Sequence, residues 1–213
     1  MDPDDVFRRL RAAILAGQLQ PNERLVESTL TESFGASRAA VRTALVRLAH
    51  DGLVEHERNR GARVRMVDEH EAGEILEARG VLEGLAARHA ATAANAADIA
   101  DLRAILAEMR ASLDAGDLLA ASDRNADLHR RILLISGHRT AIRLIDGLNG
   151  QIVRYQYRTI LVPGRSARSF GEHSAIVDAI AAGDASGAED AMRVHLAHVA
   201  EALHRHKRPA LSF

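Results

Sequence analysis

The stretch that decides the fold occupies residues 19–64 and reads LQPNERLVESTLTESFGASRAAVRTALVRLAHDGLVEHERNRGARV. Leu30 and Phe34 have helical spacing within a short segment, about 27–34, and Gly35-Ala36-Ser37 reads as a tight turn. Ser37 is a good N-cap for a following helix that ends near residues 51–52. Two short helices joined by a tight turn predict a helix-turn-helix.

The residues on either side extend this motif. Before it, apolar residues at helical spacing predict a helix that Asp4 or Asp5 caps and that residues 17–21 close. After it, residues 53–54 and 62–66 read as strands, and residues 58–61 read as the turn between them. The order of three helices and a β-hairpin predicts a winged helix-turn-helix over residues 1–66.

The second helix of the motif carries the chemistry for binding DNA. Ser37, Arg38 and Ala39 stand at its N-terminus, where backbone N–H groups face phosphate and side chains reach base edges. Arg42 lies four residues after Arg38 and therefore on the same face. Arg suits guanine or phosphate, and residues 38–65 hold seven Arg against three acidic residues. This pattern favours a nucleic-acid-binding surface.

Beyond a boundary at residues 67–70, every long segment has helical periodicity. We expect an all-helical domain over residues 71–213, and the fold class is therefore mostly α. The predicted helices span about 69–93, 97–114, 117–136, 139–162, 168–182 and 185–206.

The composition indicates where the protein is located in the cell and excludes several kinds of site. The chain of 213 residues has no Cys, which excludes disulfides, thiolate catalysis and Cys-based zinc sites. No signal peptide is evident, and no apolar run approaches the roughly 20 residues that span a membrane. We expect a cytoplasmic protein with no membrane partner.

The N-terminal motifs resemble the winged-helix domain of GntR-family regulators. The matching pieces over residues 6–66 are the Pro-Asn-Glu-Arg-Leu entry at 21–25, the Ala-Ser-Arg turn at 36–38, Arg42, and the Asn-Arg-Gly-Ala wing at 59–62. Asn22 replaces the usual Gly, and Ser28 stands where many members carry a further DNA-contacting Arg. The resemblance implies a homodimeric repressor that binds an inverted repeat in double-stranded operator DNA. The implied DNA-binding residues are Arg24, Ser37, Arg38, Ala39, Arg42, Arg60 and Gly61.

The remainder is similar to the FCD effector domain of the FadR-like subgroup. The resemblance rests on Glu77-Ala-Arg79 with Leu82-Glu83, on Asn125-Ala-Asp-Leu-His129, and on the segments around His173 and His195. It implies a divalent metal ion held by Asn125, His129, His173 and His195. Positions 125 and 129 share a helix face, and three imidazoles with one oxygen suit zinc first, with nickel, cobalt or manganese as alternatives. Asn125 replaces the usual Asp, so we expect lower metal affinity.

Members of this subgroup usually sense small carboxylic acids. The resemblance therefore implies that a carboxylate effector binds at or near the metal and that an arginine clamps it. The predicted effector-binding residues are Arg79, Arg130, Arg154 and Tyr155.

The predicted metal ligands are also compatible with two functions other than acid sensing. In a metal-responsive regulator, the divalent metal would itself be the signal, and the ligands would be identical. A metal-dependent hydrolase is disfavoured, because the sequence has no His-Glu-x-x-His motif and no placed general base. We therefore expect a regulator and not an enzyme.

Overall fold

The computed structural model describes residues 1–57, 61–160 and 162–205. Its backbone contacts divide the chain into two compact units. The first comprises Met1–Asp68 with Gly147–Val153, and the second comprises Glu69–Asp146 with Arg154–Phe213. We refer to them as the winged unit and the helical unit.

Three helices build the winged unit, namely α1 (Pro3–Leu15), α2 (Glu27–Phe34) and α3 (Arg38–His50). Asp2, rather than the predicted Asp4 or Asp5, caps α1, because Pro3 at the first turn needs no amide partner and Asp2 accepts from the Asp5 amide. Gly35 ends α2 in the left-handed region at φ 57°, and the Ser37 hydroxyl accepts from the Ala40 amide at 3.1 Å. The predicted turn and cap are therefore confirmed.

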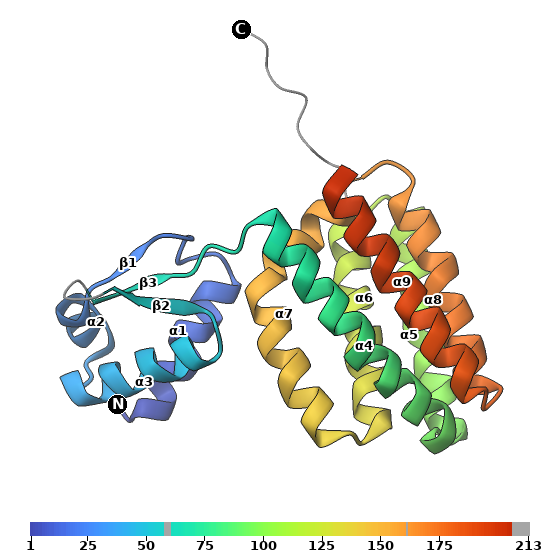
Figure 1. Ribbon diagram of the computed structural model, residues 1–213, viewed down its shortest axis with the longest axis horizontal. Coiled ribbons are helices and arrows are strands. Elements are labelled where there is room, and N and C mark those ends of the chain that lie inside the picture. Colours follow the sequence, from blue (N-terminus) through green and yellow to red (C-terminus); the bar gives the residue numbers. More distant parts are fainter. Residues whose placement is uncertain (58–60, 161, 206–213) are drawn as a thin grey trace, which may run out of the picture. The chain divides into compact units, whose positions relative to one another are not determined.

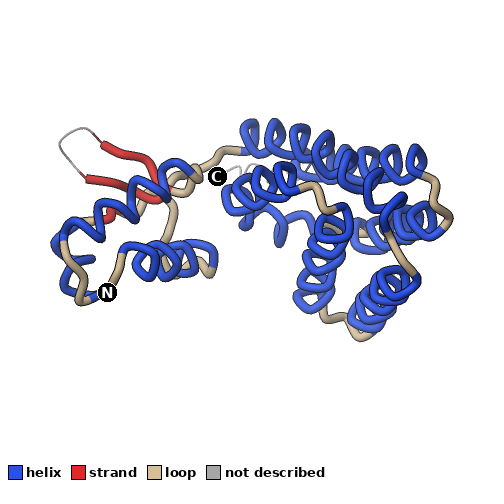
Figure 2. The backbone as a smooth tube through the Cα atoms, turned by 90° about the horizontal axis from the view of Figure 1, so that it is seen from below, coloured by secondary structure: helices blue, strands red, loops and turns tan. Residues whose placement is uncertain are grey.

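The winged unit also contains a small antiparallel sheet in the order β1-β3-β2, drawn in red in Figure 2. The hairpin strands β2 (Val54–Glu57) and β3 (Gly61–Val64) were predicted, whereas β1 (Arg24–Leu25) was not. β1 pairs with β3 and places Leu25 opposite Ala62. Gly61 has φ +87°, and a Cβ there would lie 3.3 Å from the Leu25 carbonyl oxygen, so this strand start needs glycine.

One apolar core holds the winged unit together. The stripe Val6, Leu10 and Ile14 of α1 meets the buried face of α3, and the sheet adds Leu25 and Val64. Each of these side chains is at least nine-tenths buried. The packing fixes the direction of α3 and leaves its other face to solvent.

The helical unit contains only helices among its described residues (Figures 1 and 2). They are α4 (Glu69–Ala93), α5 (Ala96–Asp114), α6 (Leu118–Ser136), α7 (Arg139–Ile160), α8 (Arg165–Ala181) and α9 (Ala185–Arg205), except that the α7 segment Gly147–Val153 is grouped with the winged unit. Together with the winged unit, they confirm the predicted mostly α fold class. None of the helices in the described ranges has the length and hydropathy of a membrane span. The predicted boundary at 67–70 stays a prediction.

Close packing around α4 positions the site. α4 lies alongside α9 and also contacts α6 and α8 (Figure 1). Its buried face is rich in small residues, including Gly80, Ala87 and Ala90, which let the neighbouring helices approach closely. α6, α8 and α9 thus come together against one face of α4, and side chains projecting inward from them can meet.

Candidate metal centre and DNA-binding surface

Three histidines from three helices meet inside the helical unit. His129 comes from α6, His173 from α8 and His195 from α9, and all three are buried. Their potential ligand atoms lie within 4.8 Å of one another. The Nε2 atom of His173 is 3.3 Å from Nε2 of His129 and 3.2 Å from Nε2 of His195. Three imidazole edges therefore face a common point.

A carboxylate on α4 orients the first of these rings. Glu83 lies 2.6 Å from Nδ1 of His129 and 2.6 Å from a guanidinium nitrogen of Arg79, one helical turn earlier. A carboxylate only accepts hydrogen bonds, so Nδ1 of His129 carries the proton that is donated to Glu83. Nε2 of His129, on the other side of the ring, faces Nε2 of His173.

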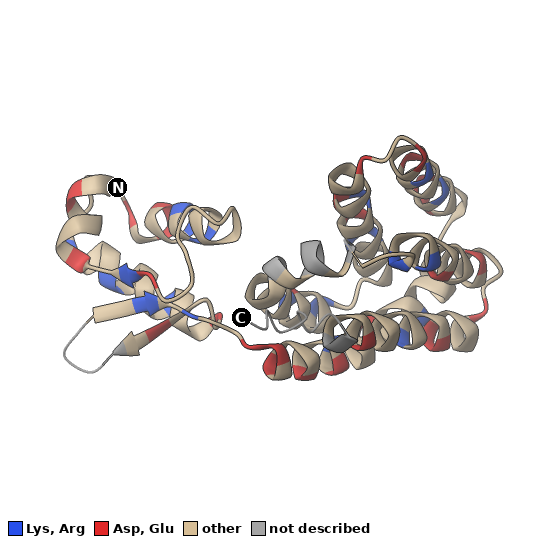
Figure 3. Ribbon diagram, turned by 90° about the horizontal axis from the view of Figure 1, so that it is seen from above, with Lys and Arg blue, Asp and Glu red and all other residues tan. Residues whose placement is uncertain are grey.

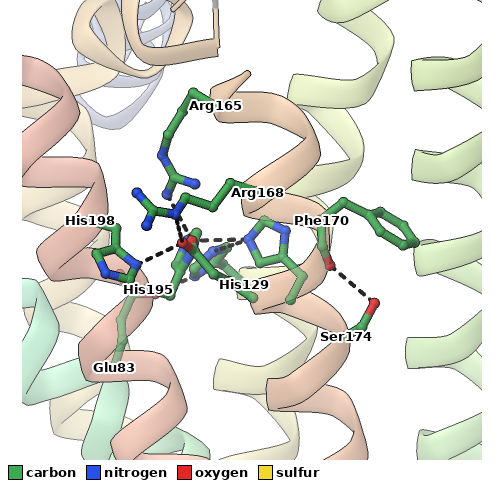
Figure 4. Close-up of polar contacts among 10 residues, drawn as sticks. Glu83, His129, Arg165, Arg168, Phe170, Ser174, His195 and His198 are labelled. Atoms are coloured by element: carbon green, nitrogen blue, oxygen red, sulfur yellow. Dashed lines mark hydrogen bonds and ion pairs between the residues drawn. The ribbon is translucent and has the colours of Figure 1, made fainter. Parts of the chain in front are cut away.

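A second carboxylate on α8 does the same for His195. Glu172 Oε2 lies 2.8 Å from Nδ1 of His195 and 2.9 Å from Nη2 of Arg165. Its other oxygen lies 2.7 Å from Nδ1 of His198. Figure 4 shows Arg165, His195 and His198, the three residues that contact this carboxylate. Carboxylates behind metal-binding histidines commonly fix the ring tautomer in this way.

Burial controls the protonation of the cluster. Burial, followed by the charges of the neighbouring histidines, lowers the pKa of His173 and of His195 well below the usual 6.5. Burial alone would raise the pKa of Glu83, but Arg79 and His129 outweigh it and lower that pKa to about 2. At neutral pH, the site therefore presents neutral His173 and His195 rings backed by an ionised Glu83.

The arrangement fits a divalent metal ion. Two nitrogens that are each about 2.1 Å from one metal and about 90–110° apart are separated by about 3.0–3.4 Å, and both measured Nε2 separations lie in this range. Nδ1 of His173 is buried without a hydrogen-bond partner among the described residues. Converging lone pairs repel one another in the absence of a proton or a cation. The donor set is therefore compatible with a divalent metal ion, and metal binding stays a prediction.

The predicted oxygen ligand lies one turn before His129 on α6. Asn125 is half-buried there and shares the face of His129. The acidic residues near Asn125 are poor substitutes as ligands, because Asp123 is exposed and Asp127 pairs with Arg124 at 2.9 Å. Asn125 as a ligand stays a prediction.

The predicted effector-binding residues have different surroundings. Arg79 is buried in its ion pair with Glu83, whereas Arg130 is exposed on α6. Tyr155 is half-buried on α7, and the side chain of Arg154 lies outside the described residues. Arg79 is connected to the histidine cluster, because its partner Glu83 also contacts His129. Effector binding by these four residues stays a prediction.

The predicted DNA-binding residues lie mainly at the exposed start of α3. Ser37, Arg38 and Ala39 are exposed there, and Arg42 follows one turn later. Arg24 is exposed on β1, and Gly61 begins β3. Arg60 lies outside the described residues.

The arginines of α3 differ in the residues that they contact. Arg42 donates from Nε to both carboxylate oxygens of Glu27 on α2, at 3.1 Å each. Arg47, near the end of α3, instead pairs with Asp4 and stacks 4.2 Å from the Phe7 ring centroid. In the helical unit, acidic positions recur from the first turn of α4 onward (Figure 3). Arg38 and Arg42 thus offer exposed positive charge at the start of α3, and DNA binding by this surface stays a prediction.

Sequence reasoning missed Glu83, Glu172 and Arg165 as site residues. Glu83 and Arg79 have the i,i+4 spacing of a helical ion pair, which is a usable signal. Glu172 directly precedes His173 but contacts His195 and His198, and no local spacing indicates this contact. Arg165 stands at the start of α8, seven residues from its partner Glu172.

Comparisons with known proteins agree with both units. Residues 3–64 match the family described as "Bacterial regulatory proteins, gntR family", and residues 74–198 match the FCD domain. The chain is 30% identical to the "Putative L-lactate dehydrogenase operon regulatory protein" of Escherichia coli (strain K12), over 95% of this chain and 86% of that protein. It is 26% identical to the "HTH-type transcriptional repressor GlaR" of the same strain, over 90% of this chain and 91% of that protein.

The fold also has a counterpart among solved structures. The structure of E. coli McbR/YncC superposes with a TM-score of 0.76 at 20% identity, covering 95% of this chain and 97% of that chain. At this identity, the likeness shows the fold alone. The two matched curated relatives are named as regulators rather than enzymes.

Proposed function

The chain belongs to the GntR family of bacterial regulatory proteins, with an FCD domain as its C-terminal part, and from this membership we propose that it is a metal-containing repressor that leaves its operator when it binds a small carboxylic acid. The convergence of three buried Nε2 atoms carries the proposal. The relatives named above are regulators or repressors of transcription.

The winged unit supplies the DNA contacts in this proposal. The exposed start of α3 enters the major groove, where Arg38 and Arg42 contact guanine or phosphate. Ser37, Ala39, Arg24, Arg60 and Gly61 complete the interface. A homodimer places two such units on the two halves of an inverted repeat. Operator occupancy then blocks transcription.

The helical unit supplies the sensor. His129, His173 and His195 would hold a divalent ion, zinc first, with nickel, cobalt or manganese as alternatives, and Asn125 would add a neutral oxygen. Such an ion supplies positive charge that attracts a carboxylate. Glu83 and Glu172 hold two of the rings by their Nδ1 atoms, so that Nε2 stays available. In this proposal, Arg79, Arg130, Arg154 and Tyr155 lie near the bound acid.

Operator binding by metal-defined protein tests the proposal. An operator is first selected from random duplexes with the purified protein. Fluorescence anisotropy then measures its Kd for metal-free, zinc-loaded, nickel-loaded, cobalt-loaded and manganese-loaded protein, with and without acetate, lactate and longer acids. We expect metal-free and metal-loaded protein to bind the operator with similar Kd, and at least one loaded form to release it when acid is added.

His173→Ala is the critical variant, and His89→Ala, an exposed histidine on α4, is its matched control. We expect His173→Ala to lose metal and acid response and to keep basal operator binding, because the DNA-binding residues lie in the other unit. A metal ion present at one hundred times its Kd adds about 2.7 kcal/mol to the stability of the protein that binds it. The melting temperature of His173→Ala should therefore be lower than that of the metal-loaded wild-type protein. Metal that abolishes or creates DNA binding without acid would favour the metal-responsive regulator instead. Retention of full metal content by His173→Ala would exclude this site.

A further inference from the structure

Arg165 is a buried cation with an unused donor beside the histidine cluster. It is 6% exposed at the start of α8, and its Nη2 donates to Glu172. Its Nη1 is buried and has no hydrogen-bond partner among the described residues. Burial of a charged N–H group without an acceptor is unfavourable, so this nitrogen is prepared to bind an anion.

Arg165 and His195 share one carboxylate, which places the Arg165 side chain beside a proposed metal ligand. Nη2 of Arg165 and Nδ1 of His195 lie 2.9 and 2.8 Å from the same Glu172 oxygen. The other Glu172 oxygen already accepts from His198. Figure 4 shows the Arg165 side chain near His195 and His198. Glu172 therefore fixes Arg165 and a histidine of the cluster in one arrangement and leaves Nη1 for another partner.

The local charges indicate how many negative charges that partner carries. Arg79 pairs with Glu83 and Arg165 pairs with Glu172, so these four charges cancel. Arg168 also faces Glu172, but its side chain is 60% exposed, so water screens its charge. Histidines that bind a metal are neutral, and Asn125 carries no charge. A divalent ion on these residues would leave two positive charges uncompensated in a buried site. A monocarboxylate cancels one of them and a dicarboxylate cancels both.

We infer that Arg165 is the second anchor of the effector site and that the effector is a small dicarboxylate, one carboxylate of which lies at the metal while the other accepts from Arg165. This inference rests on the proposed function. It differs from the sequence-based choice of arginines, because Arg79 already has a buried partner and Arg130 is exposed.

Matched acids and matched arginine variants test the inference. Isothermal titration calorimetry on zinc-loaded protein compares malonate with propionate, succinate with butyrate, and glutarate with pentanoate, each pair having the same number of carbons. We expect at least one dicarboxylate to bind about 10- to 100-fold more tightly than its partner, which is the effect of one charge-assisted hydrogen bond. Equal affinities in all three pairs would overturn the dicarboxylate assignment.

Arg165→Gln should abolish this preference while leaving zinc content, measured by mass spectrometry, unchanged. The control Arg168→Gln removes an arginine from the same helix that is 60% exposed and 3.9 Å from the same Glu172. It should change the ratio less than about threefold, as expected for an exposed pair. Arg165→Lys keeps the positive charge but loses the planar guanidinium, which can donate to Glu172 and to a ligand at the same time. This variant should therefore also lose the preference.

The outcomes separate the two proposals. Binding of an acid by wild-type protein with an unchanged preference in Arg165→Gln and in Arg165→Lys overturns the role of Arg165 alone. Failure of zinc-loaded wild-type protein to bind any of the six acids contradicts the proposed function, and the role of Arg165 with it. If Arg165→Gln does not fold by circular dichroism, Arg165→Lys decides the question.

Discussion

Each unit of this regulator contains a helical arginine paired with a glutamate, and the two pairs have opposite surroundings. In the winged unit, Arg42 is 72% exposed and lies 3.1 Å from Glu27, which is 29% exposed. In the helical unit, Arg79 and Glu83 are 7% and 2% exposed and lie 2.6 Å apart. Exposed pairs contribute little to stability, whereas breaking a buried pair leaves a charge without a partner. We therefore expect that the proposed DNA-binding surface can change without loss of the fold, whereas the buried site of the helical unit cannot.

The buried pair is tolerated because its carboxylate has two partners. Glu83 accepts from Arg79 and His129, which is why its pKa falls to about 2 despite complete burial. The unfolded chain binds a proton at this carboxyl near its ordinary pKa of 4.5, whereas the folded protein does so only near 2. The stabilisation is thus present above pH 4.5 and is lost as the pH falls toward 2.

Glu83→Ala should have the largest effect on stability. It leaves the Arg79 guanidinium buried without its carboxylate and frees the His129 ring to rotate. We expect a loss of about 3–5 kcal/mol in the free energy of unfolding, as for other broken buried pairs. Urea denaturation of metal-free protein, followed by circular dichroism, measures this loss without any contribution from metal.

Glu189→Ala is the matched control in the same unit. Glu189 pairs with Arg88 at 3.2 Å, and that arginine is 58% exposed. We expect the control to lose less than about 1 kcal/mol. Equal losses in the two variants would mean that burial does not distinguish the pairs, and the comparison would fail.

Arg38→Ala and Arg42→Ala should have the next largest effect, on operator binding rather than stability. Both side chains are exposed at the start of α3, so the fold does not depend on them. We expect each variant to weaken operator binding by about 1–3 kcal/mol. Arg88→Ala removes the same charge from α4 and should leave the operator Kd unchanged. Wild-type affinity in both α3 variants would remove this face from the interface.

The same contrast explains what the sequence could predict. The winged unit follows from local signals, such as the Ser37 cap and the Gly35 turn, because its functional surface is one contiguous stretch. β1 escaped prediction because two residues show no alternation and pair only through tertiary contact with β3. In the helical unit, the resemblance indicated the three histidines, and the structure brings them together.

The partners of the histidines required the fold. Ala-rich helices have apolar residues on several faces, so periodicity does not show that Glu83 and Arg165 point inward. The contacts of Glu172 with His195 and His198 join positions more than twenty residues apart. Only packing of α8 against α9 creates them, and a linear pattern contains no trace of that packing.

Glu27→Gln should have the smallest effect and tests the exposed half of the comparison. The substitution keeps the shape of the side chain and removes the charge that faces Arg42. We expect a stability change below about 1 kcal/mol, because water already screens this pair. Bound DNA places phosphates near the same arginine, and a carboxylate there repels them, so operator binding should tighten by about two- to threefold at low salt. Urea denaturation and anisotropy titrations at two salt concentrations measure both effects. A loss of operator affinity as large as that of Arg42→Ala would show instead that Glu27 holds Arg42 in its binding conformation, and the exposed pair would then be as indispensable to its site as the buried one.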